Sequence, residues 1–125
     1  MTTAYWCVLV AAILPLLMAG AAKGASGSRY NNARPREFLG ALSGWPARAN
    51  FAQQNSYEAF PPFAAGVIIA QLCGAPQATV DLLALTFIGA RIGYFFCYIA
   101  DQAALRSLVW LVGFASVVGL FVTAA

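Results

Sequence analysis

The sequence contains no histidine, and its three cysteines lie far apart in the chain. A structural zinc site takes four closely arranged sulfur or nitrogen ligands, and Cys7, Cys73 and Cys97 do not have that spacing. All three lie within or beside apolar segments. We therefore predict no metal site and expect three free thiols, buried among apolar residues.

Charged residues are also scarce, at 9% of the chain, whereas hydrophobic residues make up 62%. Soluble domains carry about 25% charged residues, so this composition indicates an integral membrane protein in contact with the lipid bilayer. Seven basic residues outnumber four acidic ones, but they are scattered and form no continuous basic face or nucleic-acid motif. We expect no nucleic-acid partner.

The apolar residues fall into four segments, which predict an all-α integral membrane fold, a bundle of four transmembrane helices in a single domain, residues 1–125. A spanning helix takes about 20 apolar residues, and the chain has room for four such helices. The predicted spans are residues 4–22, 46–72, 79–100 and 104–124. The first resembles a signal peptide at its small-residue end, but no basic residue precedes it. We expect a retained helix.

The basic residues gather in the predicted connection 23–45, and this loop sets the expected topology. Only Glu37 opposes four basic side chains there, Lys23, Arg29, Arg34 and Arg36, whereas the connection 74–79 has no charge. By the positive-inside rule the loop 23–45 is cytoplasmic and both termini are non-cytoplasmic. Residues 34–37 could instead bind anionic lipid headgroups, but the cluster is shorter than those credited with lipid recognition.

Polar residues extend into the predicted helix 46–72, which at roughly 40 Å is longer than a hydrocarbon core. At 100° per residue Arg48, Asn55 and Glu58 fall within about 80° of arc. In lipid such a stripe needs polar partners. The sequence therefore predicts that the first half of this helix protrudes or lines a cavity.

A second polar stripe lies on the predicted helix 79–100, where Arg91, Tyr94 and Tyr98 share one face. With Arg106 and Ser107, at the start of the last helix, the two stripes could enclose a pocket for a small zwitterionic ligand. Two simpler interpretations remain open. Glu58 could form an ion pair with Arg91 or Arg48, and the tyrosines could be anchors at the membrane surface. Asp81 is expected to cap the first turn of its own helix.

The same residues also resemble a known family in their order and spacing. They are Arg48 with Asn55 and Glu58 followed by Phe60-Pro61-Pro62-Phe63, then Ala90-Arg91-Ile92-Gly93-Tyr94 with Tyr98, and Leu105-Arg106-Ser107. The chain resembles, over most of its length, the membrane-associated proteins in eicosanoid and glutathione metabolism (MAPEG), and bacterial members in particular. The resemblance implies a homotrimer of four-helix subunits in a bacterial inner membrane.

The resemblance also implies a glutathione site between neighbouring subunits near the cytoplasmic face, with a lipophilic electrophile approaching from the bilayer. Arg106 is then the catalytic residue that stabilises the glutathione thiolate, for a transferase or a peroxidase, and Ser107 is a second candidate at the sulfur. The remaining site residues would hold the tripeptide, and these are Arg48, Asn55, Glu58, Arg91, Tyr94 and Tyr98.

The sequence departs from the animal enzymes of this family at two positions, because Ala47 and Phe51 stand where those enzymes typically have a glutamate and an arginine. Lys23 stands roughly where they place an arginine, and a lysine keeps the charge but cannot bond a carboxylate through two nitrogens at once. These departures leave open a non-catalytic trimer that binds lipid or another ligand. A small multidrug exporter also fits the size, but it usually needs a carboxylate in the first helix, and residues 4–22 contain none.

Overall fold

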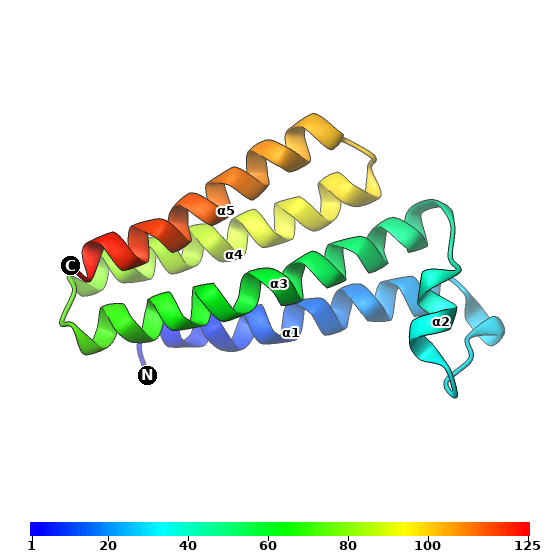
Figure 1. Cartoon of the computed structure of the whole chain (residues 1–125), viewed down its shortest axis with the longest axis horizontal. Coiled ribbons are helices and arrows are strands. Elements are labelled where there is room, and N and C mark those ends of the chain that lie inside the picture. The colour runs from blue at the N-terminus through cyan, green and yellow to red at the C-terminus, as the bar shows by residue number, and fades with distance from the viewer.

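The computed structural model describes residues 1–125, and four long antiparallel helices account for most of them. These are α1 (Thr3–Gly24), α3 (Gly44–Leu72), α4 (Gln77–Ile99) and α5 (Ala103–Thr123). Figure 1 shows α1 beside α3 and α4 beside α5, with both chain termini at one end of the bundle. The short helices η1 (Gly27–Arg29) and α2 (Pro35–Gly40) lie at the opposite end, in the connection between α1 and α3.

Each long helix begins one or two residues before the range expected from its apolar segment. The difference arises because the N-caps, which are Thr2, Ser43, Pro76 and Gln102, lie before the apolar segments, so the apolar pattern does not show where the helices start. The hydroxyl of Thr2 accepts a hydrogen bond from the Tyr5 amide at 3.4 Å and starts α1. Ser43 precedes α3 in an extended conformation, so Pro46 lies in the first turn, where its missing N–H is not needed.

Three of the long helices, α1, α4 and α5, are long and apolar enough to cross a membrane, by length and composition. The prediction of an all-helical membrane protein is therefore confirmed. The longest helix, α3, has 29 residues but is not among the three. Its first half holds the polar residues from Arg48 to Glu58, which lower its mean hydropathy.

Small residues, two phenylalanines and a few aliphatic residues fill the centre of the bundle, whereas many large aliphatic residues point outward. Phe63 of α3 and Phe87 of α4 stack with ring centroids 3.9 Å apart, next to the buried Leu120 of α5. Leu17 and Leu82, by contrast, are each 64% exposed. Such outward apolar side chains are suited to lipid, and small residues between the helices let membrane helices approach closely.

Two sequence-based expectations about single residues are wrong. Asp81 does not cap its own helix, because its Oδ1 accepts hydrogen bonds from the Ala4 amide of α1 and from the side chain of Gln77, both at 2.8 Å. The expected burial of all three cysteines fails for Cys73, which follows the last residue of α3 and is exposed. Cys7 and Cys97 are buried, and all three thiols are free.

Candidate functional site

A cleft of about 200 Å³ opens between α3, α4 and α5. Its lining combines three polar side chains with an apolar wall in which aromatic rings predominate. The polar residues are Asn55, Glu58 and Arg91, and the apolar wall consists of Ala59, Pro62, Phe87, Trp110, Phe114 and Val117. A cleft with one polar end and one apolar side suits a ligand that carries both kinds of group.

Arg91 is the most deeply buried charged residue of the cleft, with 4% of its surface exposed. Its Nη2 donates to the Ser56 hydroxyl at 2.9 Å, and its Cζ lies 4.4 Å from the centre of the Tyr94 ring. Its Nε is buried and has no hydrogen-bond partner. Burying an unpaired charge is costly, so this side chain favours an anion in the cleft.

No carboxylate of the chain neutralises Arg91. The one ion pair in the structure joins Arg34 to Glu37, so the expected alternative in which Glu58 pairs with Arg91 or Arg48 is wrong. Glu58 instead accepts a long hydrogen bond, 3.5 Å, from the side-chain amide of Asn55. The Oδ1 atom of Asn55 is buried and has no partner. The cleft therefore presents an unpaired donor, an unpaired acceptor and an exposed carboxylate.

Two tyrosines connect Arg91 to Arg106 in a row that we call the arginine–tyrosine ladder, Arg91, Tyr94, Tyr98 and Arg106. The rings of Tyr94 and Tyr98 meet edge to face with centroids 5.2 Å apart. The guanidinium carbon of Arg106 lies 4.3 Å from the centre of the Tyr98 ring. Tyr94 is 5% exposed, so the alternative role of surface anchor is wrong for this residue. The three residues of the predicted stripe on α4 thus contact one another in series, and the last of them, Tyr98, contacts Arg106 at the start of α5.

Arg48 and Ser107 bond to backbone carbonyls, and, like Tyr94, Tyr98 and Arg106, they do not line the cleft. Arg48 reaches the end of α4, where its Nε donates to the Tyr98 carbonyl at 2.9 Å and its Nη2 to the Ile99 carbonyl at 3.1 Å. The hydroxyl of Ser107 donates to the Ala103 carbonyl of its own helix at 3.1 Å. Arg48 therefore touches the ladder through the backbone, whereas Ser107 does not line the cleft.

Ser56, Trp110 and Phe114 were missed by the sequence analysis. Ser56 is 5% exposed and binds Arg91, but it points away from the polar stripe of α3, so helical periodicity assigns it to the core. Trp110 and Phe114 stack with centroids 5.3 Å apart. Their separation of four residues is a signal that the sequence offers, since residues at i and i+4 share a helix face.

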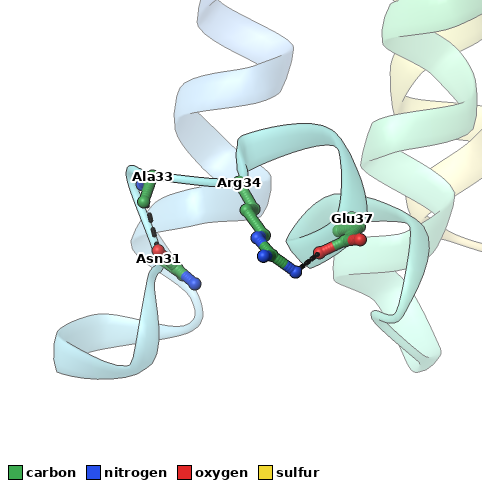
Figure 2. A network of polar contacts seen from close by, with 4 residues as sticks. All are labelled: Asn31, Ala33, Arg34 and Glu37. Atoms are coloured by element: carbon green, nitrogen blue, oxygen red, sulfur yellow. Dashed lines mark hydrogen bonds and ion pairs between the residues drawn. The ribbon is translucent and has the colours of Figure 1, made fainter.

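The basic loop lies outside the cleft. Figure 2 shows the ion pair between Arg34 Nη1 and Glu37 Oε2, 3.4 Å long, and the Asn31 side chain accepting a hydrogen bond from the Ala33 amide. Both charged side chains of the pair are 71% exposed. Arg34 thus has a counter-ion at the surface, in contrast to the buried Arg91.

Comparison with protein families gives one match. A family model described as the MAPEG family matches residues 3–125, which include the whole cleft and the ladder. No curated protein and no solved structure matches the chain.

Proposed function

The chain belongs to the MAPEG family, and from this premise we propose that it binds glutathione and uses it as a transferase or peroxidase on a lipophilic electrophile. The single observation that carries the proposal is the buried, unpaired guanidinium of Arg91 at the polar end of an apolar cleft. An anionic ligand that accepts hydrogen bonds would pair with Arg91 at the polar end, and a lipophilic substrate would pack against the aromatic wall.

The chemistry of the cleft fits glutathione, which carries carboxylates, amides, an amino group and a thiol. The free Nε of Arg91 can donate to a carboxylate, and such charge-assisted bonds are the strong ones. Asn55 Oδ1 can accept from an amide, and the Glu58 carboxylate can pair with the amino group. Tyr94 and Tyr98 extend the site from Arg91 towards Arg106 and would hold the ligand there, and Arg48 would act on the site indirectly, through its bonds to the Tyr98 and Ile99 carbonyls.

Arg106 is the proposed catalytic residue, and glutathione would supply the nucleophilic sulfur. A nearby cation stabilises a thiolate relative to a thiol. The guanidinium of Arg106 lies over the Tyr98 ring and donates no hydrogen bond within the chain, so its N–H groups remain available to donate. Ser107 is a secondary candidate at the sulfur, and it would have to exchange its bond to the Ala103 carbonyl for one to the ligand.

The size of the cleft supports a site that is completed by another copy of the chain, and the oligomer we propose is the homotrimer that the resemblance implies. Ligand pockets commonly enclose about 300–1,000 Å³, so the roughly 200 Å³ cleft of one chain accommodates only part of a tripeptide. Gln54, Tyr57 and Glu58 are exposed on α3, and polar groups at membrane depth need partners. A second copy of the chain can cover them and complete the site.

In this proposal α3 also crosses the membrane, so the chain has four spans, and the protein lies in the inner membrane of a bacterium. The basic loop 23–45 faces the cytoplasm and both termini face away from it, because the loop carries an excess of basic residues. Arg48 near the start of α3, Tyr98 near the end of α4 and Arg106 near the start of α5 belong to the end of the bundle that carries the loop (Figure 1), and this supports a glutathione site near the cytoplasmic face.

A non-catalytic trimer that binds lipid or another ligand is the second candidate, and Phe51 favours it. Phe51 is 48% exposed and its ring lies 6.3 Å from that of Tyr98. An apolar side chain therefore stands beside the ladder where the resemblance leads to an arginine. The multidrug exporter has less support, because α1 contains no carboxylate.

Glutathione binding by the purified protein tests the proposal directly. Calorimetry should show saturable binding to the wild type, and Arg106→Ala should abolish turnover and the thiolate absorbance of bound glutathione. Arg34→Ala is the matched control, since it removes an exposed arginine that belongs to neither the cleft nor the ladder. Absence of saturable binding, or full activity in Arg106→Ala, would contradict the enzymatic proposal.

Native mass spectrometry separates the candidates. The enzyme should appear as a trimer that retains glutathione, whereas a trimer that retains a lipid and takes up no glutathione supports the second candidate. Proton-coupled efflux from vesicles that is lost in Glu58→Gln would instead establish an exporter.

A further inference from the structure

The end of α4 is built as a tight reversal that leads directly into α5. The amide of Gln102 bonds the Cys97 carbonyl at 2.9 Å, and the amide of Asp101 bonds the Tyr98 carbonyl at 3.1 Å. Asp101 has a φ of 57°, the left-handed conformation that closes this type of helix end. The Ile99 carbonyl receives no backbone hydrogen bond from the turn.

Arg48 completes this helix end from another helix. Its Nη2 donates to the Ile99 carbonyl and its Nε to the Tyr98 carbonyl. The last carbonyls of a helix lack intrahelical donors and carry partial negative charge, so a cation bonded to two of them is favourable. The planar guanidinium can bond both at once, which an ammonium group cannot do with the same geometry.

The reversal connects Arg48 to Arg106. Arg106 lies in the first turn of α5, and its guanidinium rests on the ring of Tyr98, the residue whose carbonyl Arg48 binds. Figure 1 shows the reversal at the same end of the bundle as the start of α3, which carries Arg48. A shift of the Tyr98 backbone would therefore move both the ring and the guanidinium that rests on it.

We infer that Arg48 is a positioning residue, which holds the end of α4 so that Tyr98 presents Arg106 to the glutathione sulfur. The inference rests on the proposed function for its chemical consequence. Arg48 does not line the cleft, and two of its donor groups are already bonded to backbone carbonyls. Its effect on catalysis therefore passes through Tyr98 rather than through contact with the sulfur.

The physical link between Arg48 and Arg106 can be tested without glutathione. Phenylglyoxal modifies arginine side chains, and mass spectrometry can follow the rate at Arg106 with the exposed Arg34 as internal reference. We expect Arg48→Gln to speed modification of Arg106 severalfold. Arg48→Lys should give an intermediate rate, because lysine can bond only one carbonyl well. The control Arg36→Gln should leave the rate at Arg106 unchanged. An unchanged rate at Arg106 in both Arg48 variants overturns the inference.

The consequence for chemistry is tested on protein that binds glutathione. In Arg48→Gln we expect kcat to fall about tenfold, within the ~100-fold that a misplacement of about 1 Å can cost. The Michaelis constant for glutathione should stay within about twofold of the wild type, because Arg48 does not touch the ligand. The thiolate absorbance of bound glutathione should fall with kcat, and Arg48→Lys should restore part of both.

The two arms separate the failure of this inference from the failure of the proposed function. A wild type that binds no glutathione refutes the proposed function, and the labelling still decides whether Arg48 holds Arg106. Faster labelling of Arg106 with unchanged thiolate absorbance and kcat shows that Arg48 only stabilises the turn, which overturns the positioning role. If Arg48→Gln fails to fold, Arg48→Lys carries both measurements.

Discussion

Arg91 Nη2 lies 2.9 Å from the hydroxyl oxygen of Ser56, and this bond joins α4 to α3 between two side chains that are each at least 95% buried. The Ser56 hydroxyl also lies 2.8 Å from the Ala52 carbonyl, to which it donates, and 3.3 Å from the sulfur of Met18. It therefore accepts from Arg91 while its own hydrogen is engaged elsewhere, and the orientation of Arg91 depends on it.

Replacing Ser56 with alanine should destabilise the protein and misorient Arg91. The change leaves a second nitrogen of a buried cation without a partner, which costs about 1–3 kcal/mol. Unfolding of the detergent-solubilised protein by added SDS measures the loss, and calorimetry should show weaker glutathione binding. Thr86→Val is the control, since that hydroxyl also donates to a carbonyl of its own helix and lies outside the cleft and the ladder. Equal stability of Ser56→Ala and wild type would contradict the role of Ser56.

Replacing Arg91 with methionine should separate stability from binding. Exchanging a buried charge for an apolar side chain of similar size is often neutral or stabilising by about 1–4 kcal/mol, and Arg91 has no carboxylate partner to lose. We expect unchanged or higher resistance to SDS together with loss of glutathione binding. The matched surface variant Arg34→Met should alter neither quantity appreciably, because exposed ion pairs contribute little. Tight glutathione binding by Arg91→Met would contradict the assignment of the polar end of the cleft.

Trp110→Ala should weaken binding of the lipophilic substrate and spare that of glutathione. Trp110 stacks on Phe114 in the apolar wall, and losing an aromatic contact of this kind costs roughly 1 kcal/mol or more beyond its area. We expect a Michaelis constant for the lipophilic substrate that is about tenfold higher, which corresponds to about 1.4 kcal/mol. Leu108→Ala provides the comparison, because Leu108 is exposed on α5 outside the cleft. Equal effects of the two variants would show that the aromatic wall is not the substrate surface.

Asp81→Ala should destabilise the end of the bundle that lies far from the ladder. The carboxylate caps the first turn of α1 through the Ala4 amide, and loss of a capping side chain costs about 0.5–2 kcal/mol. Asp81→Asn keeps an acceptor oxygen and should lose less. Hydrogen exchange at the Ala4 amide reports the change locally, and glutathione affinity should remain at the wild-type value in both variants. Slow exchange at Ala4 in Asp81→Ala would show that another group caps α1.

The sequence predicted the helices well where an apolar segment defines them, because burial and helical periodicity leave a direct pattern in the residues. The contact between Arg91, Tyr94 and Tyr98 was predictable for the same reason, since their spacing puts them on one helix face. The starts of α3 and α4 were set two residues too late, because the residues of the first turn lie before the apolar segment and leave no apolar pattern.

Other features depend on contacts that no spacing encodes. Asp81 binds an amide 77 residues earlier in the chain, and Arg48 binds two carbonyls, which every residue possesses. Ser56 carries no charge and points into the core, so only the position of Arg91 reveals what it does. Glu58 was a reasonable counter-ion by composition, but the helices place its carboxylate beyond ion-pair distance of both arginines.

The cap that Asp81 provides for α1 also bears on the order in which the bundle is assembled during synthesis. The first helix leaves the ribosome long before residue 81 does, so its first turn stays incomplete until the start of α4 is in place. We expect the Ala4 amide to exchange rapidly in a nascent chain truncated before Asp81, and to become protected once the chain extends beyond α4. The arrival of α4 then completes the N-terminal boundary of α1, which the Thr2 hydroxyl alone begins.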